Sequence, residues 1–177
     1  YVKVANPDAK ADVFKKLAPN ALWWFRWAAL FTFLTGVILL HQVTAKLSTE
    51  IILGSTMGTL MMLNVWGIIW RNQKIVLGMK EGDAAVAGAK AGLASRTNTL
   101  FSVPMLMYMV YSAHSPGAYL AVDGWTTTSL FLGLAIIFAI EANAIWGKML
   151  PVIMSVRAVI ISSFVLAVAL KLITDLL

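Results

Sequence analysis

The sequence predicts an all-α integral membrane protein, a bundle of five transmembrane helices, and three observations carry that prediction. Hydrophobic residues make up 60% of the 177-residue chain and charged residues only 12%, which is too few to cover a water-soluble surface. The mean hydropathy is +0.81. The apolar residues come in blocks of about 20, the length that crosses a hydrocarbon core of roughly 30 Å as a helix.

Five apolar stretches follow an amphipathic N-terminal segment, residues 1–20, which we expect on the cytoplasmic membrane surface. Pro19 precedes the first stretch, and Lys46 to Glu50 form the polar turn after it. Pro116-Gly117 interrupts the helical pattern before the fourth stretch, and Pro151 opens the fifth near its first turn. The transmembrane domain is expected over 21–177, with spans at about 21–43, 51–70, 99–113, 125–146 and 152–172 and a Gly- and Ala-rich hinge before the third.

Basic residues are unevenly divided between the two sides of this predicted bundle. Twelve Lys and Arg residues fall on the side of the N-terminus and two, Lys46 and Lys171, on the other. The positive-inside rule therefore predicts a bacterial inner-membrane protein with a cytoplasmic N-terminus and a periplasmic C-terminus. The net charge of +6 is explained by contact between basic residues and lipid headgroups. The sequence has no groove motif of basic and aromatic residues that would predict nucleic-acid binding.

Polar side chains interrupt the apolar spans at similar depths. Asn64 and Glu141 each lie five or six residues before the Trp that ends their span, roughly 7 to 9 Å inside the membrane boundary. A carboxylate at that depth is costly and normally finds a partner. We expect Glu141 to pair with Arg157, with Asn64 or Asn143 completing the hydrogen bonds, and proton or quinone chemistry is the alternative role. The members of this predicted polar layer are Arg26, Asn64, Glu141, Asn143 and Arg157.

The chain has no cysteine, so a metal would need His, Met or carboxylate ligands. His41 and His114 end the first and third predicted helices, both near the outer face. We expect interfacial histidines and no cofactor, because a b haem usually has its ligands well inside the helices. The alternative is a haem b or copper site formed by His41 and His114, since both groups accept imidazole nitrogen.

The second span opens with Gly54-x-x-x-Gly58, a small-residue groove that predicts close packing against a neighbouring helix. No nucleophile elbow, phosphate loop or HExxH motif is present in the sequence. Hydrolase and nucleotide chemistry are therefore not expected.

Two stretches, GTLMMLNVWGIIWRNQKIVLG and KAGLASRTNTLFSVPMLMYMVYSAHSPGAY, carry an ordered set of motifs. Those motifs are Asn64-Val65, Asn72-Gln73-Lys74, Arg96 with Asn98, Val103-Pro104 and His114-Ser115-Pro116. In this order they resemble the membrane-embedded N-terminal domain of the bacterial cytochrome-linked urate oxidase family. LWWFRWAALFTFLTGVILL is similar to the preceding helix of that family, so the resemblance runs from about Pro19 to Trp146.

The resemblance implies a membrane domain joined to an external cytochrome c that passes electrons toward a respiratory oxidase. This sequence has no CxxCH motif, and its fourth span carries AIEANAIWG where the family tends to place basic and His residues. We therefore expect a non-catalytic or electron-transfer-associated subunit of an inner-membrane oxidoreductase or respiratory assembly, rather than an enzyme by itself. The expected partners are membrane lipids and other membrane-protein subunits, among them a cytochrome c or a terminal oxidase. A self-contained redox protein using His41 and His114 is the alternative.

Overall fold

A computed structural model describes residues 7–42, 47–114 and 126–176. Within those ranges the chain is almost entirely helical. The elements, in chain order, are α1 (Pro7–Gln42), α2 (Thr49–Leu63), the π-helix η2 (Asn64–Ile69), α3 (Trp70–Val76), α4 (Ala84–His114), α5 (Thr126–Trp146), α6 (Pro151–Met154) and α7 (Val156–Leu176). The all-α fold predicted from the sequence is confirmed.

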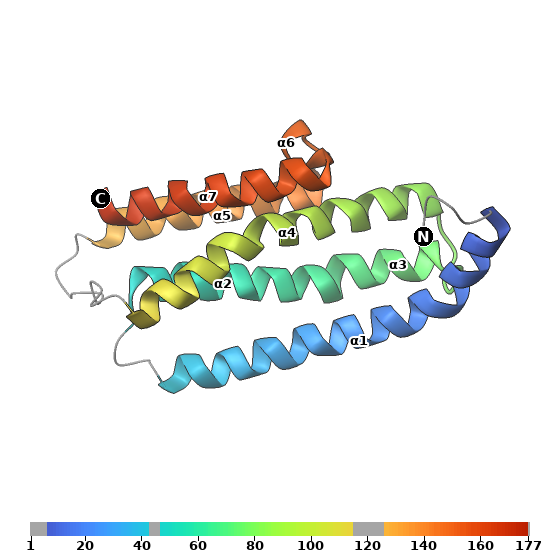
Figure 1. Ribbon diagram of the computed structural model, residues 1–177, viewed down its shortest axis with the longest axis horizontal. Coiled ribbons are helices and arrows are strands. Elements are labelled where there is room, and N and C mark those ends of the chain that lie inside the picture. The colour runs from blue at the N-terminus through green and yellow to red at the C-terminus, as the bar shows by residue number, and fades with distance from the viewer. Residues whose placement is uncertain (1–6, 43–46, 115–125, 177) are drawn as a thin grey trace.

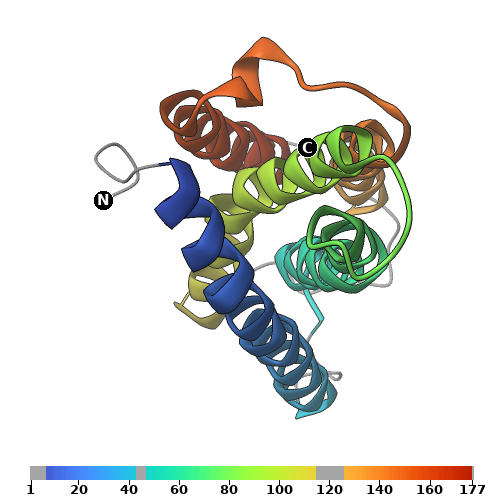
Figure 2. The same ribbon diagram turned by 90° about the vertical axis from the view of Figure 1, so that its right-hand side faces the viewer.

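The helix α4 is the centre of the bundle. The elements α2, η2 and α3 follow one another without a break and pack along α4, and α5 and α7 also pack against it. Helix α1 contacts α2 and η2 and lies at the edge of the bundle. Figure 1 shows the long helices running side by side, and Figure 2, seen along them, shows α1 apart from the others.

Four helices in the described part of the chain are long and apolar enough to cross a membrane, at residues 16–42, 49–76, 128–146 and 156–176. Helix α4 has 31 residues but is not one of the four, so the predicted count of five spans is not confirmed. Its composition gives a physical reason. Helix α4 carries Lys90, Arg96 and Asn98 among many Ala and Ser residues, which lowers its mean hydropathy, and Asn98 bonds to a neighbouring helix rather than facing lipid.

The boundaries of two helices differ from those expected, and local capping explains both. Helix α4 begins at Ala84, well before Thr99, because the Oδ1 atom of Asp83 accepts the N–H groups of Ala85 (2.8 Å) and Val86 (3.1 Å). The Ala-rich residues taken for a hinge are strong helix formers and continue from this cap.

Pro151 opens only the short α6, because Ser155 has an extended backbone (φ −101°, ψ 159°) and interrupts the helix. The Oγ atom of Ser155 then accepts the N–H of Ala158 at 3.0 Å and caps α7.

Fully buried side chains from α2, α4, α5 and α7 form the main core. They are Leu53, Met57, Phe101, Tyr108, Ile137 and Leu170. At Gly54 the two central helices approach closely, because a Cβ atom there would lie 3.3 Å from the Cβ of Tyr108. At Gly58 the nearest atom to such a Cβ is the flexible sulfur of Met105, at 3.4 Å. The small-residue contact therefore lies between α2 and α4, and it is tightest at Gly54.

Candidate functional site

Three side chains from three helices meet in the interior of the bundle, and we call Asn64, Asn98 and Glu141 the polar centre. The Nδ2 group of Asn64 donates to Oδ1 of Asn98 at 2.9 Å and to Oε2 of Glu141 at 3.1 Å. The Nδ2 group of Asn98 in turn donates to the backbone carbonyl of Met61 at 3.0 Å. Asn64 is 1% exposed and Glu141 6%, whereas Asn98 is partly buried, so the contact between Asn64 and Glu141 is the most enclosed part of the centre.

The π-helix places Asn64 in this centre. Element η2 begins at Asn64 itself, and the backbone N–H of Trp70 donates to the carbonyl of Val65, five residues back. A π-helical turn holds one more residue than an α-helical turn, and such insertions frequently occur at functional sites. Here the wider turn buries Asn64, Val65 and Ile69 on the side that packs against α4. The π-helix could not be predicted from the sequence, since all six of its residues also fit an α-helix.

Glu141 forms the hydrogen bond expected with Asn64 but not the ion pair expected with Arg157. Glu141 accepts a hydrogen bond from Asn64, whereas Arg157 is exposed near the start of α7. No ion pair joins the two residues in the part of the chain that the structure describes. The expectation assumed a short turn between two continuous helices. The extended segment after Trp146, followed by α6 and Ser155, instead places Arg157 at the helix start.

Arg26 also lies outside the polar centre. Its guanidinium carbon is 3.3 Å from the ring centroid of Trp70 and 5.7 Å from that of Trp66. The backbone carbonyl of Arg26 accepts the indole N–H of Trp66 at 3.3 Å, which ties α1 to η2. Stacking on electron-rich rings stabilises a cation that has little access to water. Among the side chains that the structure describes, aromatic rings and not a carboxylate therefore hold the Arg26 charge.

Asn143 has a local role at the end of α5. Its Nδ2 group donates to the carbonyl of Lys148 at 3.3 Å, and its own carbonyl accepts the N–H of Gly147 at 2.9 Å. A Cβ atom at position 147 would collide with the side chain of Asn143, so the glycine leaves room for this cap. Of the predicted polar layer, the structure brings together Asn64 and Glu141 and places Arg26, Asn143 and Arg157 elsewhere.

The model of the urate oxidase N-terminal family matches residues 39–169. This range takes in α2, α4, α5 and most of α7, and it is well over half of the chain. The chain belongs to the urate oxidase N-terminal family. The family resemblance predicted from the motifs is therefore confirmed. Neither the comparison with curated proteins nor the comparison with solved structures gave a match.

The residues that suggested the urate oxidase N-terminal family fall into two groups in space. Asn64 and Asn98 belong to the polar centre, where Asn98 was not expected as a member. Asn72 lies on α3, where its Nδ2 group donates to the carbonyl of Ile68 at 2.8 Å. Gln73 and Lys74 follow it, half-buried, and Arg96 is half-buried on α4. The motif is therefore not one continuous site.

Pro104 explains a contact that the sequence analysis missed. Proline lacks an N–H, so the carbonyl four residues earlier, that of Leu100, loses its usual helical partner. Ser163 on α7 supplies the donor, because its hydroxyl lies 2.7 Å from that carbonyl, and it also accepts the N–H of Val103 at 3.3 Å. Membrane helices commonly tolerate proline through such help from a neighbouring helix. A search of the sequence for a Ser on a facing helix would have found Ser163.

The two histidines lie at the same end of the bundle, where α1 and α4 end (Figure 1). His41 is exposed in the last turn of α1. His114 is the last residue of α4, and its side chain lies outside the described residues. The described side chains include no group of three or more His, Cys, Asp or Glu residues that could hold a metal ion. The two-histidine site stays a prediction.

A second polar group, also missed from the sequence, lies near the end of α7. Lys171 forms an ion pair with Asp175 one helical turn later, and its Nζ atom is 3.7 Å from the ring centroid of Tyr111 on α4. The i, i+4 spacing of Lys171 and Asp175 was the available signal. Because the charges of Lys171 and Asp175 cancel, that end of α7 carries little net positive charge.

Proposed function

We propose that the chain is a non-catalytic, electron-transfer-associated subunit of an inner-membrane oxidoreductase or respiratory assembly. The family match over residues 39–169 carries the proposal, because it covers the packed helices themselves. The polar centre supports it. Its amides bond to one another, to Glu141 and to a backbone carbonyl, an arrangement suited to fixing three helices in register.

We also propose five membrane spans, with α4 as the third. At about 1.5 Å per residue, its 31 residues extend roughly 46 Å, which exceeds the hydrocarbon thickness. It lies among helices that are apolar enough to span. The start of α1, the 77–83 turn and the segment before α6 share one end of the bundle in Figure 1. That end carries most of the basic residues, so we place it in the cytoplasm and the end of α7 in the periplasm.

The subunit role is tested by purifying the tagged chain from its native inner membrane in a mild detergent. We expect it to migrate with a haem-containing protein whose haem is reduced and reoxidised in the complex. The chain produced alone is expected to show no Soret band. A chain that migrates alone, with no haem protein in the same fraction, would overturn the proposal.

The same spectra test the alternative, in which haem b or copper is held by His41 and His114. That alternative predicts a Soret band or stoichiometric copper in the chain produced alone, lost in both His41→Ala and His114→Ala. A matched substitution, Gln42→Ala, changes an exposed residue beside His41 and is expected to leave the spectrum unchanged under either reading.

A further inference from the structure

Two cations share one aromatic ring at the basic end of the bundle. The guanidinium carbon of Arg26 lies 3.3 Å from the ring centroid of Trp70, and the Nζ atom of Lys74 lies 5.5 Å from the same centroid. Arg26 comes from α1 and Lys74 from α3, so the ring brings together charges from two helices. Two like charges that contact one ring repel one another, and a nearby anion would relieve that repulsion.

One buried hydrogen-bonding group of Arg26 is not satisfied by the described protein. The Nε atom of Arg26 is buried and has no hydrogen-bond partner there. No carboxylate in the described residues pairs with Arg26 or Lys74. Stacking on Trp70 compensates the charge of the guanidinium, but its N–H groups lie in the plane of the group and still need acceptors. An anion with several oxygen acceptors matches this need, and a phosphate forms bidentate bonds with a guanidinium.

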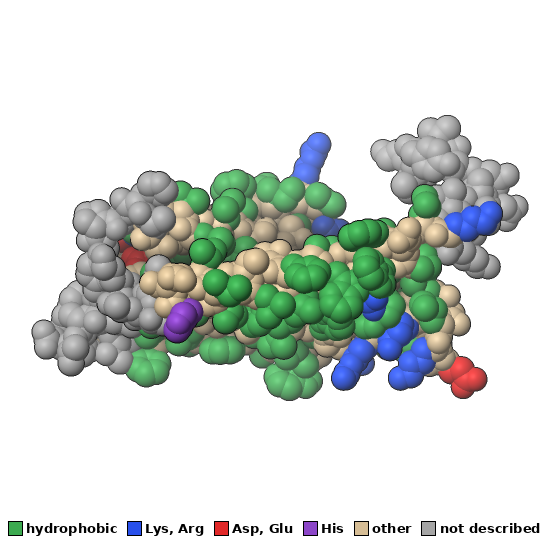
Figure 3. Space-filling view, turned by 90° about the horizontal axis from the view of Figure 1, so that it is seen from below, with side chains coloured by type: hydrophobic (Ala, Val, Ile, Leu, Met, Phe, Trp, Pro, Cys, Tyr) green, Lys and Arg blue, Asp and Glu red, His purple; other side chains and the backbone are tan. Residues whose placement is uncertain are grey.

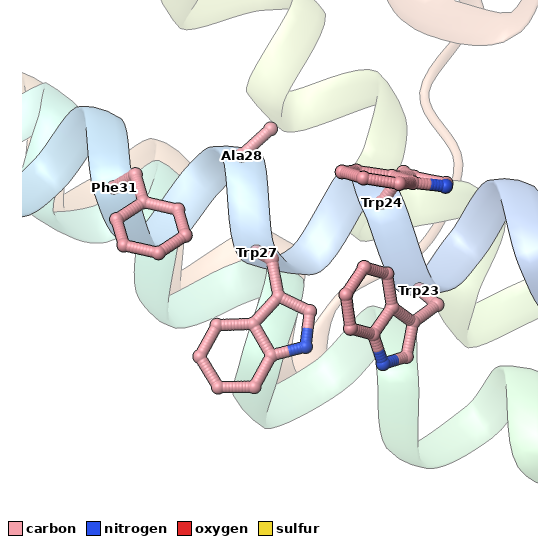
Figure 4. Close-up of a pocket in the computed structure, with 5 residues that line it drawn as sticks. All are labelled: Trp23, Trp24, Trp27, Ala28 and Phe31. Carbon is pink, nitrogen blue, oxygen red and sulfur yellow. The ribbon is translucent and has the colours of Figure 1, made fainter.

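A wholly apolar groove lies beside these cations on α1. It has a volume of about 430 Å³ and is lined by Trp23, Trp24, Trp27, Ala28 and Phe31. Figure 4 shows Trp23, Trp27 and Phe31 along one edge of the helix, with Trp24 and Ala28 on the other. The groove and the cations are neighbours, because the rings of Trp27 and Trp66 are 5.8 Å apart and Arg26 contacts Trp66. An aromatic groove of this kind suits a hydrocarbon chain.

We propose that Arg26 and Lys74, held against the ring of Trp70, bind the phosphate of an anionic phospholipid whose acyl chain lies in the groove of α1. Charge complementarity favours a lipid with net negative charge, because Arg26 and Lys74 bring two positive charges to one ring. Depth selects a lipid over a soluble anion, since Arg26 lies within an apolar helix that is long enough to span a membrane. Figure 3 shows further basic side chains gathered at this end of the same face. Such a lipid would hold α1 against the rest of the bundle.

Native mass spectrometry of the full chain tests the site. The protein is titrated with dioleoyl phosphatidylglycerol, with dioleoyl phosphatidylcholine and with inorganic phosphate. We expect one phosphatidylglycerol to be retained per chain, with weaker retention of the phosphatidylcholine that has the same acyl chains. Inorganic phosphate at equal concentration is not expected to displace the lipid. Displacement by phosphate would show a simple anion site and overturn the proposal.

Two substitutions that remove the same charge separate the site from general attraction of anionic lipid. Arg26→Gln is expected to weaken retention of phosphatidylglycerol about tenfold or more, because a bidentate charged contact is lost. Lys90→Gln, at an exposed position on α4, is expected to leave it unchanged. Equal losses in the two variants, or no loss in Arg26→Gln, would overturn the proposal.

If Arg26→Gln does not fold, Arg26→Lys carries the test, because it keeps the charge and loses the planar fork. It is expected to weaken retention of phosphatidylglycerol, and unchanged retention would contradict the site. Quenching of tryptophan fluorescence by phosphatidylglycerol with brominated acyl chains gives an independent measurement. In the wild-type protein, brominated phosphatidylglycerol is expected to quench more strongly than brominated phosphatidylcholine, and equal quenching would also overturn the proposal.

Discussion

Replacing Asn64 by Leu is expected to destabilise the bundle by roughly 1 to 3 kcal/mol. The Nδ2 group of Asn64 donates to both Asn98 and Glu141, so the change leaves two buried oxygens without that donor. A hydrogen bond between membrane helices contributes about 0.6 kcal/mol on average and at most about 1.7 kcal/mol. Two such bonds give the stated range. Leu approximates the branched shape of Asn, so the lost polar contacts are the main change.

Glu141→Gln is the matched control for this change. The amide oxygen of Gln still accepts from Asn64, so we expect a loss below about 1 kcal/mol, within the worth of one such bond. An ion pair between Glu141 and Arg157 would instead make Glu141→Gln strongly destabilising, because the arginine would lose its countercharge. The two variants thus distinguish the observed amide partner from the ionic one that the sequence suggested.

The measurement is reversible unfolding in mixed micelles, followed by the fluorescence of the seven tryptophans. Double-mutant cycles of Asn64→Leu with Asn98→Leu and with Glu141→Leu report the two coupling energies. If Asn64→Leu proves as stable as the wild type, or Glu141→Gln costs more than Asn64→Leu, the two hydrogen bonds of Asn64 do not stabilise the bundle as described.

Three further predictions concern packing and topology. Ser163→Ala is expected to cost about 1 to 3 kcal/mol in the same unfolding assay, and Pro104→Ala in that background to restore part of it by returning a helical N–H. An unimproved double variant would refute this. Gly54→Ala is expected to lower the midpoint of thermal unfolding more than Gly58→Ala, because it meets the Cβ of Tyr108 rather than a flexible sulfur; the reverse order would contradict the packing. A cysteine at position 80 is expected to react with an impermeant maleimide only after the inner membrane is permeabilised. Labelling in intact spheroplasts would contradict the proposed topology.

Sequence patterns predicted the class of the fold because that class depends on composition and on the lengths of apolar blocks. The same patterns did not reveal that α4 begins at Ala84. Polar residues that pack inside the bundle, Thr97 and Asn98 among them, lower the mean hydropathy of α4, and its Ala-rich beginning was taken for a hinge. Hydropathy measures preference for lipid, so it is less informative for a helix whose polar residues pack against protein.

The site was predicted in part, for a reason that is also physical. Asn64 and Glu141 could be placed at one depth by counting residues from the Trp at each helix end. Depth does not say which way a side chain faces around its helix, so residue counting could neither exclude Arg157 from the polar centre nor include Asn98 in it. The choice depends on the π-helical turn at Asn64 and on the extended residues before α7. Neither follows from helical periodicity.

The motif of the urate oxidase N-terminal family therefore combines two separable kinds of residue. Asn64, Asn98 and Pro104 lie between helices and bond within the bundle, or require a neighbour to do so, and their substitution should change stability first. Gln73 and Lys74 lie at the basic end, where headgroups and partner proteins can reach them. In a subunit that acts through its partners, substitutions at this end should weaken retention of lipid or partner at unchanged unfolding midpoint. The unfolding midpoint and the retention of lipid or partner, measured on each variant, would then distinguish the two groups. A buried catalytic centre would instead lose turnover, without losing stability, when residues of the first group are substituted.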